Sequence, residues 1–265
     1  MSLVDHVLAL ILLVGLAVWG ARNSTARHIA RLARRIAADP NARTKEYLWT
    51  IAMEWGLTLA LLAGWLWAAR PLPALGVVLP EGTGAWWTVL VCVAGIFFYV
   101  QQARTVAASL DAQASLRKEL ESQPNVRMIL PATVREARVF AGLAITAGIC
   151  EEVLYRGYLL WYLQSLGLGR GAVVVAIVAF GLAHIFQGIR GIVLTGVMGA
   201  VFMGVYLLTG SLVAPIVLHA TVDLANFLMA YRILQRTETS ASSSPDLRGS
   251  HDRPDASGGE QSHRH

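Results

Sequence analysis

The stretch AGICEEVLYRGYLLWYL, residues 147–163, decides the fold because it places Glu151, Glu152 and Arg156 inside an otherwise apolar run. Charged side chains near the centre of a bilayer are costly, so ionisable residues in a membrane segment are candidates for function. If this run crosses a membrane, its two adjacent carboxylates and its guanidinium mark a site.

The composition is that of an integral membrane protein. Of the 265 residues, 55% are hydrophobic and 15% are charged, whereas soluble domains carry about 25% charged residues. A helix that crosses a hydrocarbon core of about 30 Å needs about 20 mostly apolar residues. Segments of this kind predict an all-α, polytopic transmembrane helical bundle of about seven spans with an intramembrane active site. The segments are 4–21, 47–68, 85–101, 139–163, 171–186, 191–208 and 211–231.

The charges between these segments predict the orientation of the chain. Seven Arg and Lys residues lie between the first and second segments, and six lie between the third and fourth. The loops that follow the second and the fourth segments each hold a single Arg. This alternation places the N-terminus outside and the C-terminus in the cytoplasm of a plasma or inner membrane. The net charge of +5 is then explained by basic loops that bind anionic lipid and determine the topology. We therefore expect the lipid bilayer, and not nucleic acid, as the partner of the basic segments.

Three regions are expected along the chain. Residues 1–138 hold N-terminal transmembrane helices with basic cytoplasmic loops, and residues 139–231 hold the core that carries the buried charges. Residues 232–265 are rich in Ser, Gly, Pro and charge, which predicts a disordered cytoplasmic tail. Within the first region, apolar residues alternate with arginines over 24–38, which predicts an amphipathic helix on the inner leaflet.

The ionisable residues inside the spans cluster in the second half of the chain. They are Glu54, Glu151, Glu152, Arg156, His184, His219 and Asp223. Five of these seven fall in the fourth and seventh segments, and one more ends the fifth. This clustering predicts one site built by several helices.

Helical spacing sorts the residues of the fourth segment. Glu152 and Arg156 are four residues apart and lie on one face of a helix, so they are expected to pair. Such a pair removes most of the cost of burying either charge, and we assign it a role in stability and orientation. Glu151 is turned away from this pair and needs a partner from another helix.

The remaining residues leave alternatives open. His219 and Asp223 share one helix face, which fits a packing hydrogen bond, half of a metal site, or a histidine with an orienting carboxylate. His184 shares a face with Phe180 and, taken alone, is more often a core histidine. Glu54 is either an edge residue whose carboxylate reaches the interface, which we prefer, or a carboxylate that polarises the site.

These groups suit one kind of chemistry. A free carboxylate, two imidazoles and a further carboxylate in a cavity that excludes water can activate a water molecule against a carbonyl group. The sequence contains neither the GxSxG pattern of a serine nucleophile nor the HExxH pattern of a zinc protease. Peptide hydrolysis by a carboxylate-activated water is the reaction that remains.

Three motifs carry a resemblance to a known family. They are EEVLYR at 151–156, FGLAH at 180–184 and HATVD at 219–223. Their order and spacing (EExxxR, FxxxH, HxxxD) resemble those of the CAAX-protease and bacteriocin-processing family of intramembrane endopeptidases, also called CPBP or Abi proteins. The resemblance covers about residues 139–231.

The resemblance implies an endopeptidase that acts on a membrane-associated protein or peptide substrate. It makes Glu151 the general base, working with His184 on the attacking water, and gives His219 and residue 223 the support of the oxyanion. Glu152 and Arg156 match the remaining positions of the first motif and support the site.

One position departs from the family pattern. The CAAX-processing members usually have Asn where this chain has Asp223. An ionised Asp cannot donate a hydrogen bond to an oxyanion, so it would have to be protonated, orient His219 or bind a metal. No cofactor is required by the pattern, but His184, His219 and Asp223 form a set that leaves zinc open.

Two other functions are weighed against the protease. A proton- or ion-coupled transporter also uses intramembrane Glu, His and Arg, but the spans show no pair of Gly- or Pro-broken helices in corresponding halves. A catalytically silent scaffold or immunity factor of the same fold is compatible with the three motifs.

Overall fold

The computed structural model describes residues 1–242, and within this range all regular secondary structure is helical, as predicted. The first membrane helix is one rod formed by α1 (Leu3–Leu10), a π-helical turn η1 (Ile11–Gly15) and α2 (Leu16–Asn23). The other helices of the N-terminal part are α3 (Ala26–Ala38), α4 (Ala42–Trp67), η2 (Leu72–Leu75), α5 (Gly82–Ala108), α6 (Leu110–Ser122) and α7 (Pro124–Ile129). Those of the C-terminal part are α8 (Val134–Glu152), η3 (Val153–Leu159), α9 (Leu160–Ser165), α10 (Gly171–Ala183), η4 (Ile185–Gln187), α11 (Gly188–Thr209) and α12 (Val213–Ser242).

Five helices of the described chain are long and apolar enough to cross a membrane, which identifies an integral membrane protein with several crossings. They are Leu3–Asn23, Ala42–Trp67, Gly82–Ala108, Ile185–Thr209 and Val213–Gln235. These correspond to the first, second, third, sixth and seventh predicted segments. The prediction of about seven spans therefore holds for five, and segments four and five need separate descriptions.

The fourth segment is one continuous helix formed by α8, η3 and α9, in which the central turn is π-helical. It carries Glu136, Glu151, Glu152 and Arg156, so it is more polar than the five apolar helices. It lies in the middle of the bundle rather than against lipid, and every residue of η3 is buried. The charged side chains of Glu136, Glu152 and Arg156 are buried and therefore face protein.

The fifth segment, 171–186, is shorter than predicted. Its helix α10 has 13 residues, which at 1.5 Å per residue reach about 20 Å and do not cross a core of about 30 Å. The helix ends at Ala183, where His184 is its C-cap, and η4 and Gly188, with φ of +79°, reverse the chain into α11. The predicted segment runs past the end of the helix because a count of apolar residues does not register this turn. Irregular backbone is tolerated at membrane depth where it is enclosed by protein or lines a cavity.

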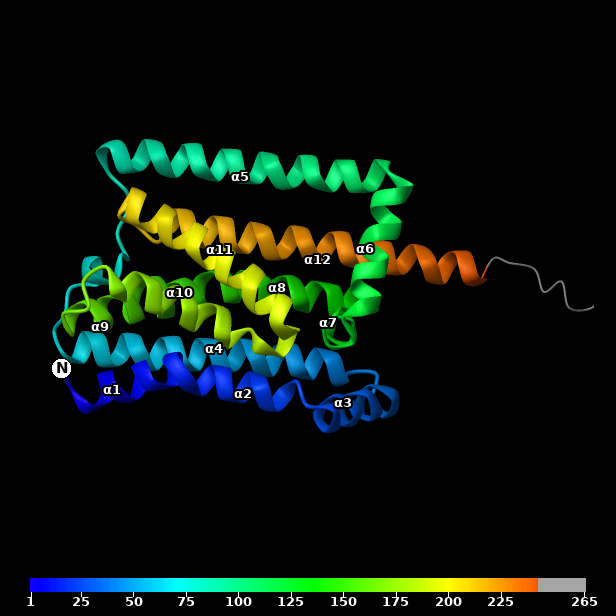
Figure 1. Cartoon of the computed structure of the whole chain (residues 1–265), viewed down its shortest axis with the longest axis horizontal. Coiled ribbons are helices and arrows are strands. Elements are labelled where there is room, and N and C mark those ends of the chain that lie inside the picture. The colour runs from blue at the N-terminus through cyan, green and yellow to red at the C-terminus, as the bar shows by residue number, and fades with distance from the viewer. Residues whose placement is uncertain (243–265) are drawn as a thin grey trace, which may run out of the picture.

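Helices α4 and α8 pack side by side and run in the same direction (Figure 1). Tyr47 of α4 meets Phe140 of α8 with ring centroids 5.2 Å apart, and Trp55 Nε1 donates a hydrogen bond to Thr146 Oγ1 at 3.2 Å. On another side of α8 lies α12, which also packs against α5, so that α5 forms an edge of the bundle in Figure 1.

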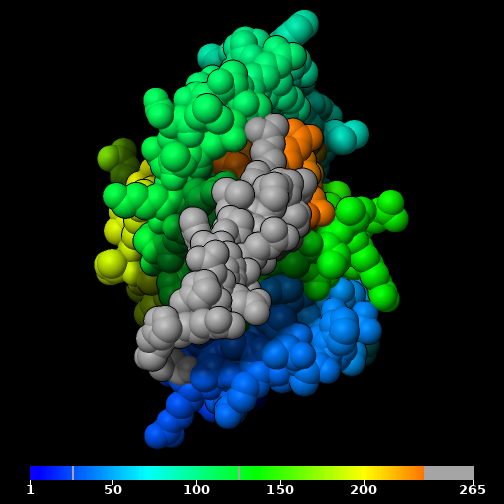
Figure 2. Space-filling view, turned by 90° about the vertical axis from the view of Figure 1, so that its right-hand side faces the viewer, coloured from blue at the N-terminus to red at the C-terminus, as the bar shows by residue number. Residues whose placement is uncertain are grey.

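The basic segments gather at one end of the molecule. Helices α3, α6 and α7 lie there, together with the start of α8 (Figure 1). Viewed from this end, the N-terminal helices and α5–α6 occupy opposite edges of the molecule (Figure 2). Arg43 Nε donates to Met128 O at 3.0 Å and Tyr47 OH donates to Ile129 O at 2.6 Å, which fastens α4 to α7. This arrangement agrees with the alternation of loop charges, while the side of the membrane that this end faces stays a prediction.

The C-terminal helix is longer than the predicted last segment. Helix α12 continues to Ser242, into the region 232–265 that was expected to be a disordered tail. Residues 243–265 lie outside the described residues, and the expectation of disorder there stays a prediction.

Candidate active site

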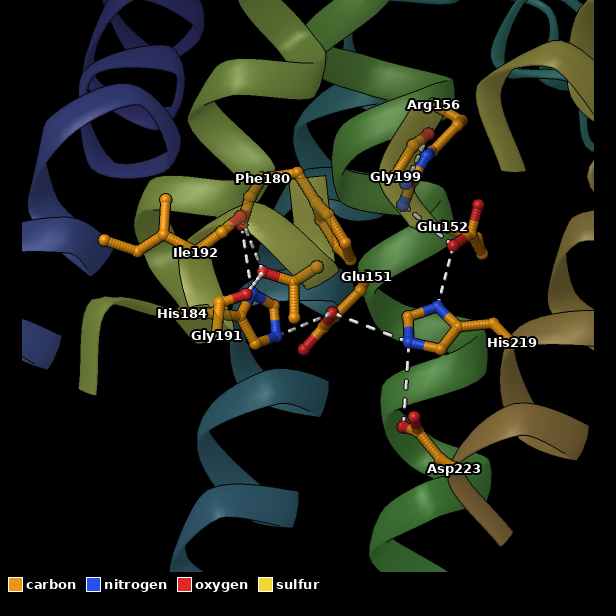
Figure 3. Close-up of polar contacts among 11 residues, drawn as sticks. Glu151, Glu152, Arg156, Phe180, His184, Gly191, Ile192, Gly199, His219 and Asp223 are labelled. Atoms are coloured by element: carbon orange, nitrogen blue, oxygen red, sulfur yellow. Dashed lines mark hydrogen bonds and ion pairs between the residues drawn. The ribbon is translucent and has the colours of Figure 1, made fainter. Parts of the chain in front are cut away.

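The ionisable residues of the three motifs lie together in the middle of the bundle (Figure 3). The junction of α8 and η3 supplies Glu151, Glu152 and Arg156, the C-cap of α10 supplies His184, and α12 supplies His219 and Asp223. The short α10 matters here, because its early end brings the imidazole of His184 to the level of the carboxylates.

Glu152 and Arg156 form the expected ion pair. Arg156 Nη1 lies 2.8 Å from Glu152 Oε1, and both side chains are fully buried. The guanidinium also donates from Nη2 to the carbonyl of Gly199 in α11 at 3.1 Å and lies 4.1 Å from the ring centroid of Phe180. The pair thereby holds α8, α10 and α11 together, which the sequence did not predict.

Gly199 is a residue of the site that sequence reasoning missed. A Cβ atom on it would lie 2.8 Å from Cδ1 of Phe180 and 3.3 Å from Nη2 of Arg156. Only glycine therefore lets the backbone of α11 approach the buried guanidinium. No spacing in the sequence distinguishes this glycine from Gly196 or Gly204 in the same helix.

His219 is the second partner of Glu152. Its Nδ1 lies 2.7 Å from Glu152 Oε1, and its ring stacks on Phe202 with centroids 4.9 Å apart. Because a carboxylate only accepts, Nδ1 is the nitrogen that carries hydrogen in this contact. The other ring nitrogen, Nε2, is thus aimed at Glu151 and Asp223, at 3.9 Å and 3.6 Å.

His184 is oriented in a similar way. Its Nδ1 lies 2.9 Å from the carbonyl oxygen of Phe180, one turn earlier in α10. A carbonyl also only accepts, so the hydrogen is on Nδ1 and Nε2 is turned toward Glu151 Oε2, at 3.9 Å. An acceptor behind each imidazole fixes its tautomer, as commonly found for histidines that act in catalysis or bind metals.

Glu151 lies between these two imidazoles (Figure 3). Its Oε2 is 3.9 Å from Nε2 of His184 and 3.9 Å from Nε2 of His219. Both distances exceed a hydrogen bond, and this buried oxygen has no hydrogen-bond partner in the part of the chain that the structure describes. Polar groups separated by more than about 3.5 Å are often bridged by water. The carboxylate that the sequence left without a partner in its own helix thus faces two histidines from two other helices.

The exposure of the side chains in the site increases toward Asp223. The exposed fraction of the side chain rises from 0% for Glu152 through 6% for His219 and 18% for Glu151 to 38% for Asp223. Asp223 lies one turn further along α12 than His219, on the way to the end of the bundle where α3, α6 and α7 lie (Figure 1).

The three residues that left zinc open in the sequence are not gathered into a metal site. Among residues 1–242, no group of three or more His, Cys, Asp and Glu side chains is placed to hold a metal ion. His184, His219 and Asp223 therefore do not form a ready-made ligand set, and we derive no catalytic step through a metal.

The preferred interpretation of Glu54 was wrong. Helix α4 begins at Ala42 and has 26 residues, so that Glu54 stands at its middle and not near an edge. Its Oε2 is buried and has no hydrogen-bond partner among the described residues. A carboxyl group buried at the middle of the helix does not reach the interface, so the second interpretation, a carboxylate that polarises the site, is left as a prediction.

The fold and the site define a helical membrane protein in which a buried carboxylate faces two oriented imidazoles. Residues 133–225 match the family model described as Type II CAAX prenyl endopeptidase Rce1-like, and the chain therefore carries a domain of this family over those residues. The match begins at Thr133, the N-cap of α8, and ends in α12 two residues after Asp223. The resemblance drawn from the three motifs is thus confirmed, and a domain of this family suggests an intramembrane protease. Comparisons with curated proteins and with solved structures found no match.

Proposed function

We propose that the protein is an intramembrane endopeptidase that hydrolyses peptide bonds of membrane-associated proteins or peptides, with Glu151 and His184 activating the attacking water. One observation carries the proposal: the buried Oε2 of Glu151 has no hydrogen-bond partner within residues 1–242 and lies 3.9 Å from both imidazoles. A carboxylate with a free oxygen next to a properly oriented imidazole is suited to take a proton from water.

In the first step, a water molecule between Glu151 and His184 attacks the carbonyl carbon of the scissile peptide bond. Its proton passes to Glu151, and the electron pair of the C=O bond moves to the oxygen, which becomes an oxyanion. In the second step, the oxyanion reforms the C=O bond, the C–N bond breaks, and Glu151 returns the proton to the leaving amine nitrogen. The products are a carboxylic acid and an amine, and Glu151 returns to its starting state.

His219 and Asp223 stabilise the oxyanion. When Nε2 of His219 carries a proton, it can donate to the oxyanion, and Oδ2 of Asp223 at 3.6 Å stabilises the positive ring. This role does not require Asp223 to donate a hydrogen bond itself. It therefore accommodates Asp at a position where the resembling CAAX proteases usually have Asn.

Glu152 and Arg156 act behind these groups. Glu152 Oε1 accepts from both Arg156 and His219, at 2.8 Å and 2.7 Å, so the buried ion pair fixes the imidazole against rotation. Positioning of this kind contributes to rate without contact with substrate.

The proposal is tested with purified protein in lipid nanodiscs and a panel of membrane-anchored peptides, with and without a prenyl group. The variants are Glu151→Gln and His184→Ala, and Glu121→Gln is the control because it neutralises an exposed carboxylate of α6. We expect the native protein and the control to cleave the peptide. We expect the cleavage rate of the two site variants to fall by about 10²-fold or more.

Three other results would count against the proposal or correct it. Undiminished cleavage by Glu151→Gln would refute the assignment of the base. Cleavage that is lost with a zinc chelator and restored by zinc would refute the metal-free mechanism. Absence of cleavage of every peptide, with peptide binding retained, would favour the silent scaffold of the same fold.

A further inference from the structure

The turn that carries His184 is supported by a helix outside the family domain. Helix α2 packs against α10 and against η4, and it belongs to the first membrane helix, Leu3–Asn23. The family model covers residues 133–225 and so does not include it. None of the three motifs contains a residue of α2, and the mechanism above does not use one.

The hydrogen bonds of His184 are local to its turn. Its backbone N–H donates to the carbonyl of Gly181 at 3.1 Å, and its own carbonyl accepts from the N–H of Gln187 at 2.9 Å. Its ring Nδ1 donates to the carbonyl of Phe180 at 2.9 Å. These partners all lie within four residues of His184, so they fix the imidazole relative to the turn. The position of the turn itself depends on the helices that pack against it.

Gly20 is the residue at which α2 meets this turn. It is buried, and a Cβ atom on it would lie 3.1 Å from Cγ2 of Ile185 and 3.2 Å from the carbonyl oxygen of Ala183. These two residues directly follow and precede His184. Carbon atoms pack best at about 3.5–4.0 Å, so a methyl group on residue 20 would press on the backbone at both sides of the histidine.

An ion pair from α6 reaches the same connection but holds it less firmly. Arg190, near the start of α11, pairs with Glu119 of α6, and the two side chains are 61% and 30% exposed. Exposed pairs contribute little to stability, because water and salt screen them. The buried contact at Gly20 is therefore the one that can fix the depth of the turn.

We propose that Gly20 is a positioning residue that sets, through its missing side chain, the distance between His184 and Glu151. The inference rests on the proposed peptidase function and adds to it a group from the first membrane helix. Nε2 of His184 lies 3.9 Å from Oε2 of Glu151, and a shift of the turn changes the space in which these groups activate the water. A misplacement of about 1 Å can cost about 10²-fold in rate.

The first test compares glycine substitutions at two positions of the same membrane helix in the cleavage assay. Gly20→Ala is expected to lower kcat by about tenfold and Gly20→Val by about 10²-fold or more, with KM changed less than about threefold. Gly15→Ala is the control, because the atoms nearest to its Cβ belong to Ile11 of the same helix, at 3.7 Å. Its kcat is expected to stay within about twofold of the native value.

A second substitution should restore the room that Gly20→Ala removes. Ile185→Leu keeps the size of the side chain but lacks the Cγ2 branch that the new methyl group would meet. The double variant Gly20→Ala, Ile185→Leu is therefore expected to recover kcat to within about threefold of Ile185→Leu alone.

Two results would overturn the inference. One is a kcat within about threefold of the native value for both Gly20→Ala and Gly20→Val. The other is a fall in kcat that is equal in Gly20→Ala and Gly15→Ala, follows Tm and is not recovered by Ile185→Leu. That pattern belongs to the packing of the helix and not to the placement of His184.

The second test does not depend on cleavage. Solid-state NMR of the protein in lipid, with its histidines labelled with nitrogen-15, reports the ring nitrogens of His184 and His219. Their signals are assigned by their loss in His184→Gln and His219→Gln. Gly20→Ala is expected to shift the signals of His184 and not those of His219, and Gly15→Ala is expected to shift neither.

Unchanged His184 signals in Gly20→Ala would refute the inference. Should the native protein cleave no peptide, the proposed function fails while this spectrum still decides the role of Gly20.

Discussion

His219 and Arg156 bond to the same oxygen atom. Oε1 of Glu152 accepts from Nδ1 of the histidine at 2.7 Å and from Nη1 of the arginine at 2.8 Å. The ion pair that makes the buried charges tolerable in α8 is therefore also the group that orients an imidazole of α12. Stability and the geometry of the site are coupled through one carboxylate.

Removal of this carboxylate should affect both properties. Glu152→Ala leaves the guanidinium of Arg156 buried without its partner, and breaking a buried pair in this way costs about 3–5 kcal/mol. We expect a marked fall in Tm in detergent, and loss of cleavage in the fraction that folds. The exposed Glu121 of α6 provides the comparison, since Glu121→Ala should change stability by less than about 0.5 kcal/mol. Similar Tm values for the two variants would contradict a stabilising role of the pair.

Two glycines of α11 should respond oppositely to the same substitution. Gly199→Ala places a methyl group against Phe180 and Arg156, which we expect to destabilise the protein by about 1–3 kcal/mol. Gly204→Ala meets no atom within 4 Å and replaces a poor helix former, so it should be neutral or stabilise by up to about 1 kcal/mol. Thermal unfolding of the two variants in one detergent gives the comparison, and a more stable Gly199→Ala would disprove the close approach.

Asp223 should tolerate amidation better than truncation. Asp223→Asn keeps an oxygen near Nε2 of His219 and gains a donor for the oxyanion, so kcat should stay within about tenfold of the native value. Asp223→Ala loses both and is expected to reduce kcat by about 10²-fold. The measurement is kcat at saturating peptide, and equal activities of the two variants would exclude a role for this side chain at the oxyanion.

An ion pair between Arg70 and Asp5, at the other end of the bundle, should contribute to stability alone. Arg70 binds Asp5 through two hydrogen bonds of 2.7 Å each and lies 4.6 Å from the ring centroid of Trp161. Asp5→Asn breaks the bidentate contact and is expected to cost about 1–3 kcal/mol. Because the site is remote from this contact, kcat of the folded protein should be unchanged. A fall in kcat without a fall in Tm would show that this ion pair has another role.

The sequence predicted the residues of the site better than their contacts. The helical repeat correctly placed Glu152 next to Arg156, because the two residues lie four apart on one helix and share a face. The contact of Glu152 with His219 spans 67 residues of sequence and depends on how α8 and α12 pack, which no local pattern specifies. The free face of Glu151 was predicted for the same reason as the pair, since adjacent residues point in different directions.

Two errors of the sequence reading have one physical origin, namely the position of helix ends. The predicted span 171–186 counted apolar residues through a turn that Gly188 makes possible, and so it missed that α10 stops at His184. For α4, the polar start at Ala42 was not counted as helix, which moved Glu54 toward an apparent edge. Hydropathy shows which residues are apolar enough to lie in lipid, whereas backbone hydrogen bonds and caps determine where a helix ends.

The π-helical turn η3 directly follows the two carboxylates and contains Arg156. A π turn takes up about one residue more than an α turn, so this helix contains a surplus residue at the point where its charged groups meet. The turn absorbs this surplus, so the helix beyond it keeps the direction that a regular α-helix one residue shorter would have. Arg156 lies inside the widened turn and makes its bonds to Glu152 and to the carbonyl of Gly199 from there. In this helix the register of the chain, and not only its composition, determines whether the buried charges find one another.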